Sequence, residues 1–196
     1  MKLALVLSFA LAALPAGATI KTKIVEYTHG DVVLQGYVAY EDGFKDTRPG
    51  ILVVHEWYGH GPYARRRATE LAKLGYTAFA VDMYGKGVYA KTHEEAGQLA
   101  GAFFTDRKLM RERALAGLEQ LKKMPYVDAA QLGAIGYCFG GSTVLELARA
   151  GTELKGVVSF HGALSTPSPA TEAPKAKILV LHGADDVVDL RRDLAA

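Results

Sequence analysis

Gly136-Tyr137-Cys138-Phe139-Gly140-Gly141 joins an apolar, strand-like run to a helix-like run in a chain of 196 residues. Its form is G-x-C-x-G, the nucleophile-elbow pattern with Cys in the place of Ser. A nucleophile on such a strained strand-to-helix turn needs small neighbours, and Gly136 and Gly140 supply the room. Cys138 would then lie at the N-terminus of a helix over 142–150, where the helix dipole favours a thiolate. The short pattern alone also fits a small buried Cys in an ordinary tight turn.

Composition predicts one globular domain, because 49% of the residues are hydrophobic and 22% are charged. Residues 1–18 have a different character: an apolar run from Leu3 to Pro15 follows Lys2 and ends at Ala16-Gly17-Ala18. This pattern is typical of a secretory signal peptide cleaved after Ala18, and the apolar run is too short to span a bilayer. The sequence therefore predicts an exported protein, periplasmic or secreted, whose domain covers 19–196.

The charge balance of the chain gives no support for a polyanionic partner. Removal of Lys2 with the signal peptide lowers Lys plus Arg from 23 to 22 against 21 Asp plus Glu, so the net charge would be +1. That balance gives no electrostatic reason to expect nucleic acid or membrane as a partner. A single Cys cannot form an internal disulfide, and an unpaired thiol in an oxidising compartment must be buried or used.

Hydrophobic periodicity predicts a hairpin and then an alternation of strands and helices. The predicted strands cover 23–27, 32–40, 51–54, 76–81, 131–137, 154–160 and 178–181, and the predicted helices cover 62–74, 92–100, 106–123 and 142–150. Alternation from residue 51 onward indicates the α/β class, a mainly parallel sheet with helices on both faces. The all-apolar run 178–181 is interpreted as a buried strand.

Candidate functional groups gather where the predicted parallel strands end, at the edge of the sheet that binds ligands in such folds. A thiolate nucleophile needs N–H donors for the developing oxyanion, and we expect the backbone N–H groups of Phe139 and Trp57 in that role. The motif His182-Gly183-Ala184-Asp185-Asp186 follows the last strand, where a catalytic acid is expected. Asp186 is the preferred acid and Asp185 the alternative, although either carboxylate could instead cap a turn.

Five motifs occur in one order: HEWYG (55–59), VDMYGKG (81–87), GYCFGG (136–141), SFHG (159–162) and LHGADD (181–186). Together they make the chain resemble the dienelactone hydrolase family of α/β-hydrolases, from about Lys21 to Asp186. The resemblance implies carboxymethylenebutenolidase-like hydrolysis of a small ester or lactone through a Cys-His-Asp triad and an acyl-enzyme, without a cofactor or metal.

The resemblance also implies roles for single residues. Cys138 becomes the nucleophile, Asp186 the acid, and Glu56 the carboxylate that contacts the resting cysteine. Tyr84 and Lys86 fall at substrate-binding positions. The position of Lys86 is more often Arg in the enzyme that cleaves dienelactone, so the resemblance leaves an acidic substrate open.

One element of the family pattern has no counterpart, because the catalytic His of the family follows the acid on a later loop. The six histidines of this chain, at positions 29, 55, 60, 93, 161 and 182, all precede Asp186. His55 and His161 lie at strand ends and are the alternatives for a base. The expectation is a domain that lacks its last helix, strand and helix, with an open apolar edge at 178–181. The alternative functions are an inactive family member (a pseudoenzyme or gene fragment) and a redox-sensing thiol at Cys138.

Overall fold

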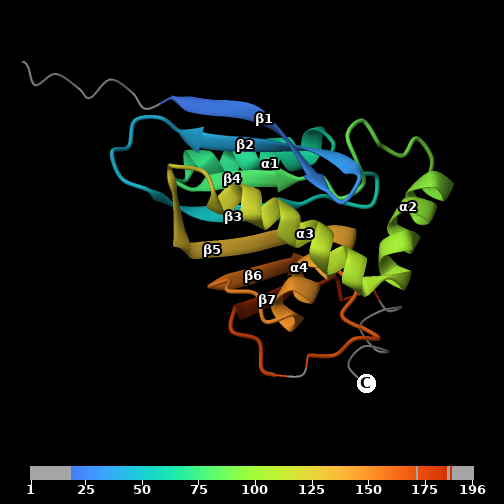
Figure 1. Ribbon diagram of the computed structural model, residues 1–196. Helices are drawn as coiled ribbons and strands as arrows, with labels where there is room; N and C mark the ends of the chain where they lie inside the picture. The colour runs from blue at the N-terminus through green and yellow to red at the C-terminus, as the bar shows by residue number, and fades with distance from the viewer. Residues whose placement is uncertain (1–18, 171, 185, 187–196) are drawn as a thin grey trace, which may run out of the picture.

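The computed structural model describes residues 19–170, 172–184 and 186, and these form an α/β structure around one twisted sheet (Figure 1). The strands are β1 (Ile20–His29), β2 (Val32–Glu41), β3 (Arg48–Val54), β4 (Thr77–Val81), β5 (Val127–Tyr137), β6 (Gly156–Phe160) and β7 (Lys177–Leu181). Their order in the sheet is β1-β2-β4-β3-β5-β6-β7. β1 pairs antiparallel with β2 and β2 antiparallel with β4, whereas the pairs from β4 through β7 are parallel.

Helices cover both faces of the sheet, as the sequence predicted (Figure 1). They are α1 (Pro62–Lys73), α2 (His93–Thr105), α3 (Arg107–Lys122) and α4 (Phe139–Arg149). On one face, Ala64, Ala68 and Ala72 of α1 pack against β2, β3 and β4. On the other face α3 and α4 cover the larger apolar cluster, which includes Phe79, Leu118 and Leu147. The expected α/β-hydrolase-like architecture is therefore confirmed.

Local signals determine where most helices begin and end. Gly75, the predicted helix stop, has a φ of +90° and donates its N–H to the Ala72 carbonyl at 3.0 Å. The Asp106 side chain caps α3 by accepting the Leu109 N–H at 2.9 Å. α2 extends five residues beyond the predicted end at Ala100, because Phe103 continues its buried face.

The turn between β5 and α4 has the steric character that its glycines predicted. Cys138 has a φ of +54°, a conformation that is strained for a residue with a side chain. A Cβ atom on Gly136 would lie 2.0 Å from the Gly140 carbonyl oxygen, and one on Gly140 would lie 2.3 Å from the Val54 carbonyl oxygen. Both positions therefore require glycine.

A buried charge cluster connects α4 to the loop that follows β6. Glu146 is fully buried and contacts Arg111 at 2.6 Å and Arg149 at 3.0 Å. The same arginines donate to the carbonyls of Ser168 and Leu164. A buried carboxylate that loses its partners costs about 3–5 kcal/mol, so this cluster holds the loop in one arrangement. No local pattern in the sequence predicts this cluster.

β7 departs from its predicted burial. Ile178, Leu179, Val180 and Leu181 are 44%, 51%, 37% and 44% exposed, although 178–181 was interpreted as a buried strand. β7 is the outermost strand of the described sheet, and β6 is the one described strand that pairs with it. Among the described residues no helix covers β7 and no strand pairs with its outer edge. The expected absence of a last helix, strand and helix stays a prediction.

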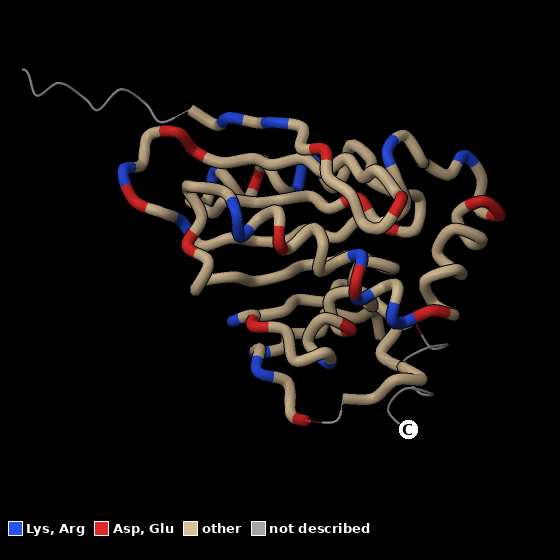
Figure 2. The backbone as a smooth tube through the Cα atoms, in the orientation of Figure 1, with Lys and Arg blue, Asp and Glu red and all other residues tan. Residues whose placement is uncertain are grey.

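Three predictions concern residues outside those described: the signal peptide at 1–18, the alternative acid Asp185, and the segment 187–196. Within the described part of the chain, no helix is both long and apolar enough to cross a bilayer. Basic and acidic residues are interspersed along the backbone (Figure 2).

The elbow sterics predict that Gly136→Ala destabilises the protein, because the new Cβ meets backbone that cannot move aside. We expect a loss of about 1–3 kcal/mol or more in the free energy of unfolding, measured by urea denaturation. Gly97→Ala is the matched control, since a Cβ there has no heavy atom within 4 Å and lies in α2. The control should be neutral or slightly stabilising. Equal stability of the two variants would contradict the steric account.

Candidate active site

Cys138 lies where β5 ends and α4 begins, partly exposed to solvent. Its N–H donates to the Phe160 carbonyl at 2.9 Å, and its carbonyl accepts the Ser142 N–H at 3.2 Å. Because that second bond is the first i to i−4 bond of α4, the N–H groups of Phe139, Gly140 and Gly141 have no acceptor within the helix. Cys138 therefore lies beside the positive end of the helix dipole.

Phe139, the first predicted oxyanion donor, is held by aromatic packing. Its side chain is 1% exposed and its ring lies 5.5 Å from Tyr84, 5.7 Å from Phe103 and 5.8 Å from Phe104. These contacts fix the first turn of α4. The Phe139 N–H, directly after Cys138 in the chain, consequently has a defined direction.

Trp57, the second predicted donor, lies in the loop after β3 together with Glu56, and both side chains are half-buried. The Tyr84 hydroxyl donates to the Trp57 carbonyl at 2.9 Å, which ties this loop to the turn after β4. The pKa of Tyr84 is raised by burial and by the nearby charge of Cys138. Tyr84, which was predicted to bind substrate, therefore lies close enough to Cys138 for the charge of one to affect the pKa of the other.

Asp82 organises the turn that carries Tyr84. Its carboxylate is 2% exposed and accepts the N–H groups of Tyr84, Gly85 and Gln35, each at 3.0 Å. Arg113 of α3 supports the same turn by donating to the Met83 carbonyl at 2.9 Å. The motif VDMYGKG was predicted only to contact substrate. An Asp directly after an all-buried strand was the signal that could have revealed this anchoring role.

Lys86 lies on the outer side of the same turn. Its Nζ atom is 2.6 Å from the Glu26 carboxylate of β1, and both side chains are 49% exposed. An ion pair this exposed contributes little free energy, so Lys86 can leave Glu26 at small cost. Its predicted contact with a substrate carboxylate stays a prediction.

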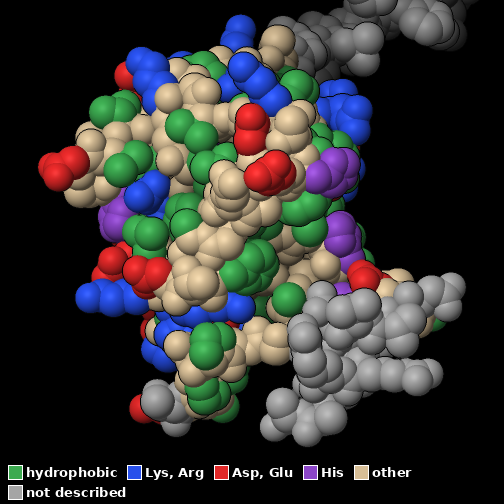
Figure 3. All heavy atoms as spheres, turned by 90° about the vertical axis from the view of Figure 1, so that its right-hand side faces the viewer, with side chains coloured by type: hydrophobic (Ala, Val, Ile, Leu, Met, Phe, Trp, Pro, Cys, Tyr) green, Lys and Arg blue, Asp and Glu red, His purple; other side chains and the backbone are tan. Residues whose placement is uncertain are grey.

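Asp186, the predicted acid, follows β7 at the carboxyl edge of the sheet. Its carboxylate lies 3.4 Å from Nε2 of His182, and neither nitrogen of that imidazole makes a hydrogen bond to another described residue. His161, one of the alternatives for a base, is exposed, with a φ of +44°. Histidine and apolar side chains share the end of the molecule toward which the parallel strands point (Figure 3).

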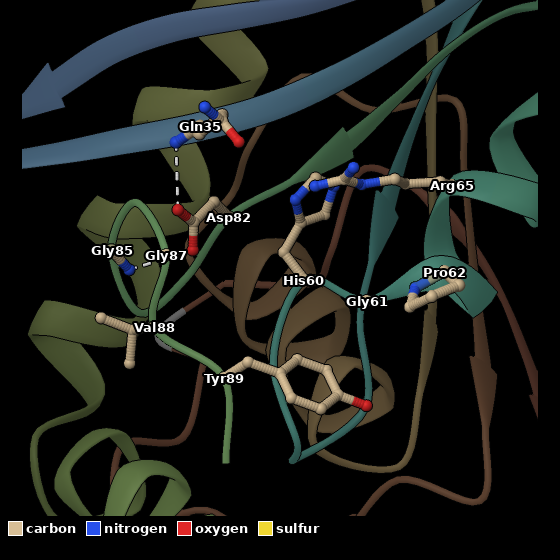
Figure 4. A pocket seen from close by; sticks show the side chains of 10 residues that line it. All are labelled: Gln35, His60, Gly61, Pro62, Arg65, Asp82, Gly85, Gly87, Val88 and Tyr89. Atoms are coloured by element: carbon tan, nitrogen blue, oxygen red, sulfur yellow. Dashed lines mark hydrogen bonds between the residues drawn. The ribbon is translucent and has the colours of Figure 1, made fainter. Parts of the chain in front are cut away.

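A cavity of about 300 Å³ lies beside the Asp82 turn, on the side toward β2 (Figure 4). Its wall includes Asp82, His60, Arg65 and Tyr89, but not Cys138, Phe139 or Trp57, so we do not place the reacting carbonyl there. Burial lowers the pKa of His60 to about 3, helped by nearby His55 and Arg65, so this imidazole is neutral at pH 7. No three His, Cys, Asp or Glu side chains of the described residues are grouped to hold a metal ion.

Comparison with known proteins identifies the family. The model of the dienelactone hydrolase family matches residues 34–192. The chain belongs to the dienelactone hydrolase family. The resemblance carried by its five motifs is thereby confirmed, and with it the membership in a family of hydrolases.

Individual relatives of this dienelactone hydrolase family member agree. A protein of Aquifex aeolicus (strain VF5), provisionally named a carboxymethylenebutenolidase, is 33% identical over 64% of this chain and 54% of its own length. The solved structure named m3DLH is 37% identical with a TM-score of 0.86, over 92% of this chain and 75% of that one. A dienelactone hydrolase-like promiscuous phosphotriesterase from metagenomic libraries is 35% identical with a TM-score of 0.84. The chain spans about half the length of the first curated relatives it matches.

The position of Cys138 predicts a thiol that ionises easily. We expect the rate of iodoacetamide alkylation to rise with a midpoint below about pH 8.5, because the helix N-terminus stabilises the thiolate. The measurement is unambiguous because the chain has one cysteine. The same protein unfolded in guanidinium is the control. A midpoint at or above that of the unfolded chain would show that the helix does not activate the thiol.

Proposed function

We propose that this family member hydrolyses a small ester or lactone through Cys138 as nucleophile. The observation that carries the proposal is the strained Cys138, with a φ of +54°, at the N-terminus of α4, where the N–H groups of the first turn have no acceptor within the helix. Strain of this kind in a residue with a reactive side chain is concentrated at functional sites. Family membership supports the hydrolase class, and the cysteine mechanism is inferred from the local geometry.

The chemistry follows from these groups. The Cys138 thiolate attacks the carbonyl carbon, and the oxygen becomes an oxyanion that accepts the N–H groups of Phe139 and Trp57. Collapse of this intermediate breaks the C–O bond, releases the alcohol oxygen, which takes up a proton, and leaves a thioester on Cys138. Water then attacks the thioester, releases the carboxylic acid and restores the thiol. In a lactone the alcohol and acid remain in one product.

Release of the acyl group requires a base to activate water, and this is where the two readings of the sequence differ. His182 is the last histidine of the sequence, and its Nε2 atom lies 3.4 Å from the Asp186 carboxylate. An enzyme that turns over and a family member that only becomes acylated share the first half of the reaction. They differ in the second half, so kinetics can separate them.

Two further features belong to the proposal. Lys86, held only by an exposed ion pair, would contact a carboxylate on the substrate, and Tyr84 would line the site beside Cys138. Export, with residues 1–18 as the signal peptide, is proposed from the sequence alone. The proposed reaction requires no metal or cofactor, and its proposed substrate is a small molecule rather than a nucleic acid.

Hydrolysis of 4-nitrophenyl acetate by wild-type, Cys138→Ser and Cys138→Ala protein tests the nucleophile. We expect Cys138→Ala to lower the rate of 4-nitrophenol release by about three orders of magnitude or more, as removal of a nucleophile does. Thermal unfolding of each variant controls for folding. Steady turnover by the wild type supports the complete hydrolase, and one stoichiometric burst supports acylation without release. A rate unchanged in Cys138→Ala would refute the assignment of Cys138.

A further inference from the structure

His55 directly follows β3, and its buried imidazole takes no part in the reaction proposed above. It is 1% exposed and lies between two rings of the site, 4.9 Å from Tyr84 and 5.8 Å from Phe139. Burial lowers the pKa of His55 to about 4, although its hydrogen bond to the Glu56 carbonyl and the charge of Asp82 act in the opposite direction. At neutral pH the ring is therefore uncharged and carries one N–H.

The hydrogen bonds of His55 determine which nitrogen carries that proton. The Met83 N–H points at Nε2 from 3.2 Å, and a backbone N–H can only donate, so Nε2 must be the bare acceptor. The proton therefore lies on Nδ1, which is 2.5 Å from the Glu56 carbonyl oxygen and donates to it. With both nitrogens engaged, His55 has no lone pair left to take a proton from Cys138. The sequence-based alternative of His55 as the base does not fit this geometry.

The Glu56 carbonyl, which accepts the His55 N–H, links this imidazole to the oxyanion donor. The Glu56 carbonyl and the Trp57 N–H belong to one planar peptide unit and point in opposite directions. Holding the carbonyl therefore aims the N–H that we assign to the oxyanion. The following peptide unit is held as well, because the Tyr84 hydroxyl donates to the Trp57 carbonyl at 2.9 Å.

We propose that His55 is a positioning residue, which fixes the Glu56–Trp57 peptide through Nδ1–H so that the Trp57 N–H faces the carbonyl attacked by Cys138. The inference rests on the proposed function. Met83, held in turn by Arg113 at 2.9 Å, fixes the tautomer. The Glu56 carbonyl also accepts the Gly59 N–H at 3.2 Å, so removal of His55 weakens the alignment of the peptide without freeing it completely.

Two amide substitutions separate the two hydrogen bonds of the imidazole. His55→Asn places a side-chain N–H₂ near the position of Nδ1 and keeps the donor to Glu56. His55→Gln places a carbonyl oxygen near the position of Nε2, which keeps the acceptor for Met83 and loses the donor to Glu56. A role confined to packing would make both variants behave alike. A role in aiming the Trp57 N–H makes only the Gln variant deficient.

The readout compares two reactions of the same thiol in the same folded sample. Acylation of Cys138 by 4-nitrophenyl acetate passes through an oxyanion, whereas alkylation by iodoacetamide displaces iodide from a saturated carbon and does not. We expect His55→Gln to slow acylation by about 10- to 100-fold, somewhat less than deletion of an oxyanion donor, while alkylation keeps the wild-type rate. His55→Asn should acylate at close to the wild-type rate.

The outcomes are distinguishable. A wild-type rate of acylation in His55→Gln, an equal loss in the Asn and Gln variants, or a parallel fall of acylation and alkylation would overturn the inference alone. Failure of the wild type to acylate at Cys138 would overturn the proposed function and this inference with it. Imidazole ¹⁵N NMR of the wild-type protein gives a readout that needs no substrate: a proton on Nδ1 supports the inference, and a proton on Nε2 overturns it.

Discussion

Close approach of backbone to backbone at the end of β5 is the constraint on which the site depends. Gly140 lies against the carbonyls of Val54 and His55, and Gly141 lies against Gly162 with a would-be Cβ contact of 2.9 Å. These contacts bring the ends of β3, β5 and β6 to one place at the start of α4. A side chain at any of these glycines would separate the elements and move Cys138 away from the loop that carries Trp57. The strain at Cys138 persists because its surroundings are packed this tightly.

Buried polar groups then hold the loops around the elbow. Asp82 accepts three N–H groups, His55 bridges two backbone segments, and Glu146 pairs with two arginines. Each group is costly to bury unless it is satisfied, so each selects one arrangement of its loop. The charged pair at Lys86 and Glu26 is different, since exposure leaves it weak and free to rearrange. Buried, satisfied groups thus hold the loops around Cys138, the proposed nucleophile, whereas the exposed Lys86–Glu26 pair can rearrange.

The sequence predicted the order of elements and the elbow because both depend on local patterns. Apolar runs identify parallel strands, and two glycines around Cys138 identify a strained turn. The roles of Asp82 and Glu146 depend on contacts between segments distant in the chain, and no local pattern reports those. The tautomer of His55 depends on Met83, 28 residues away. The run 178–181 was interpreted as a buried strand because it is apolar throughout, but its exposure depends on its place in the sheet, where β7 is the outermost described strand and pairs with β6.

The proposed nucleophile is the sulfur atom of the strained Cys138, which attacks the carbonyl carbon of the substrate. Rapid acid quenching of the wild-type protein mixed with 4-nitrophenyl acetate, followed by intact mass spectrometry and peptide mapping, tests it most directly. The account predicts one acetyl group per chain, carried by the peptide that contains Cys138 and released by hydroxylamine as a thioester is. Consumption of the ester with acetyl groups only on lysines or hydroxyls, and none on Cys138, would contradict it.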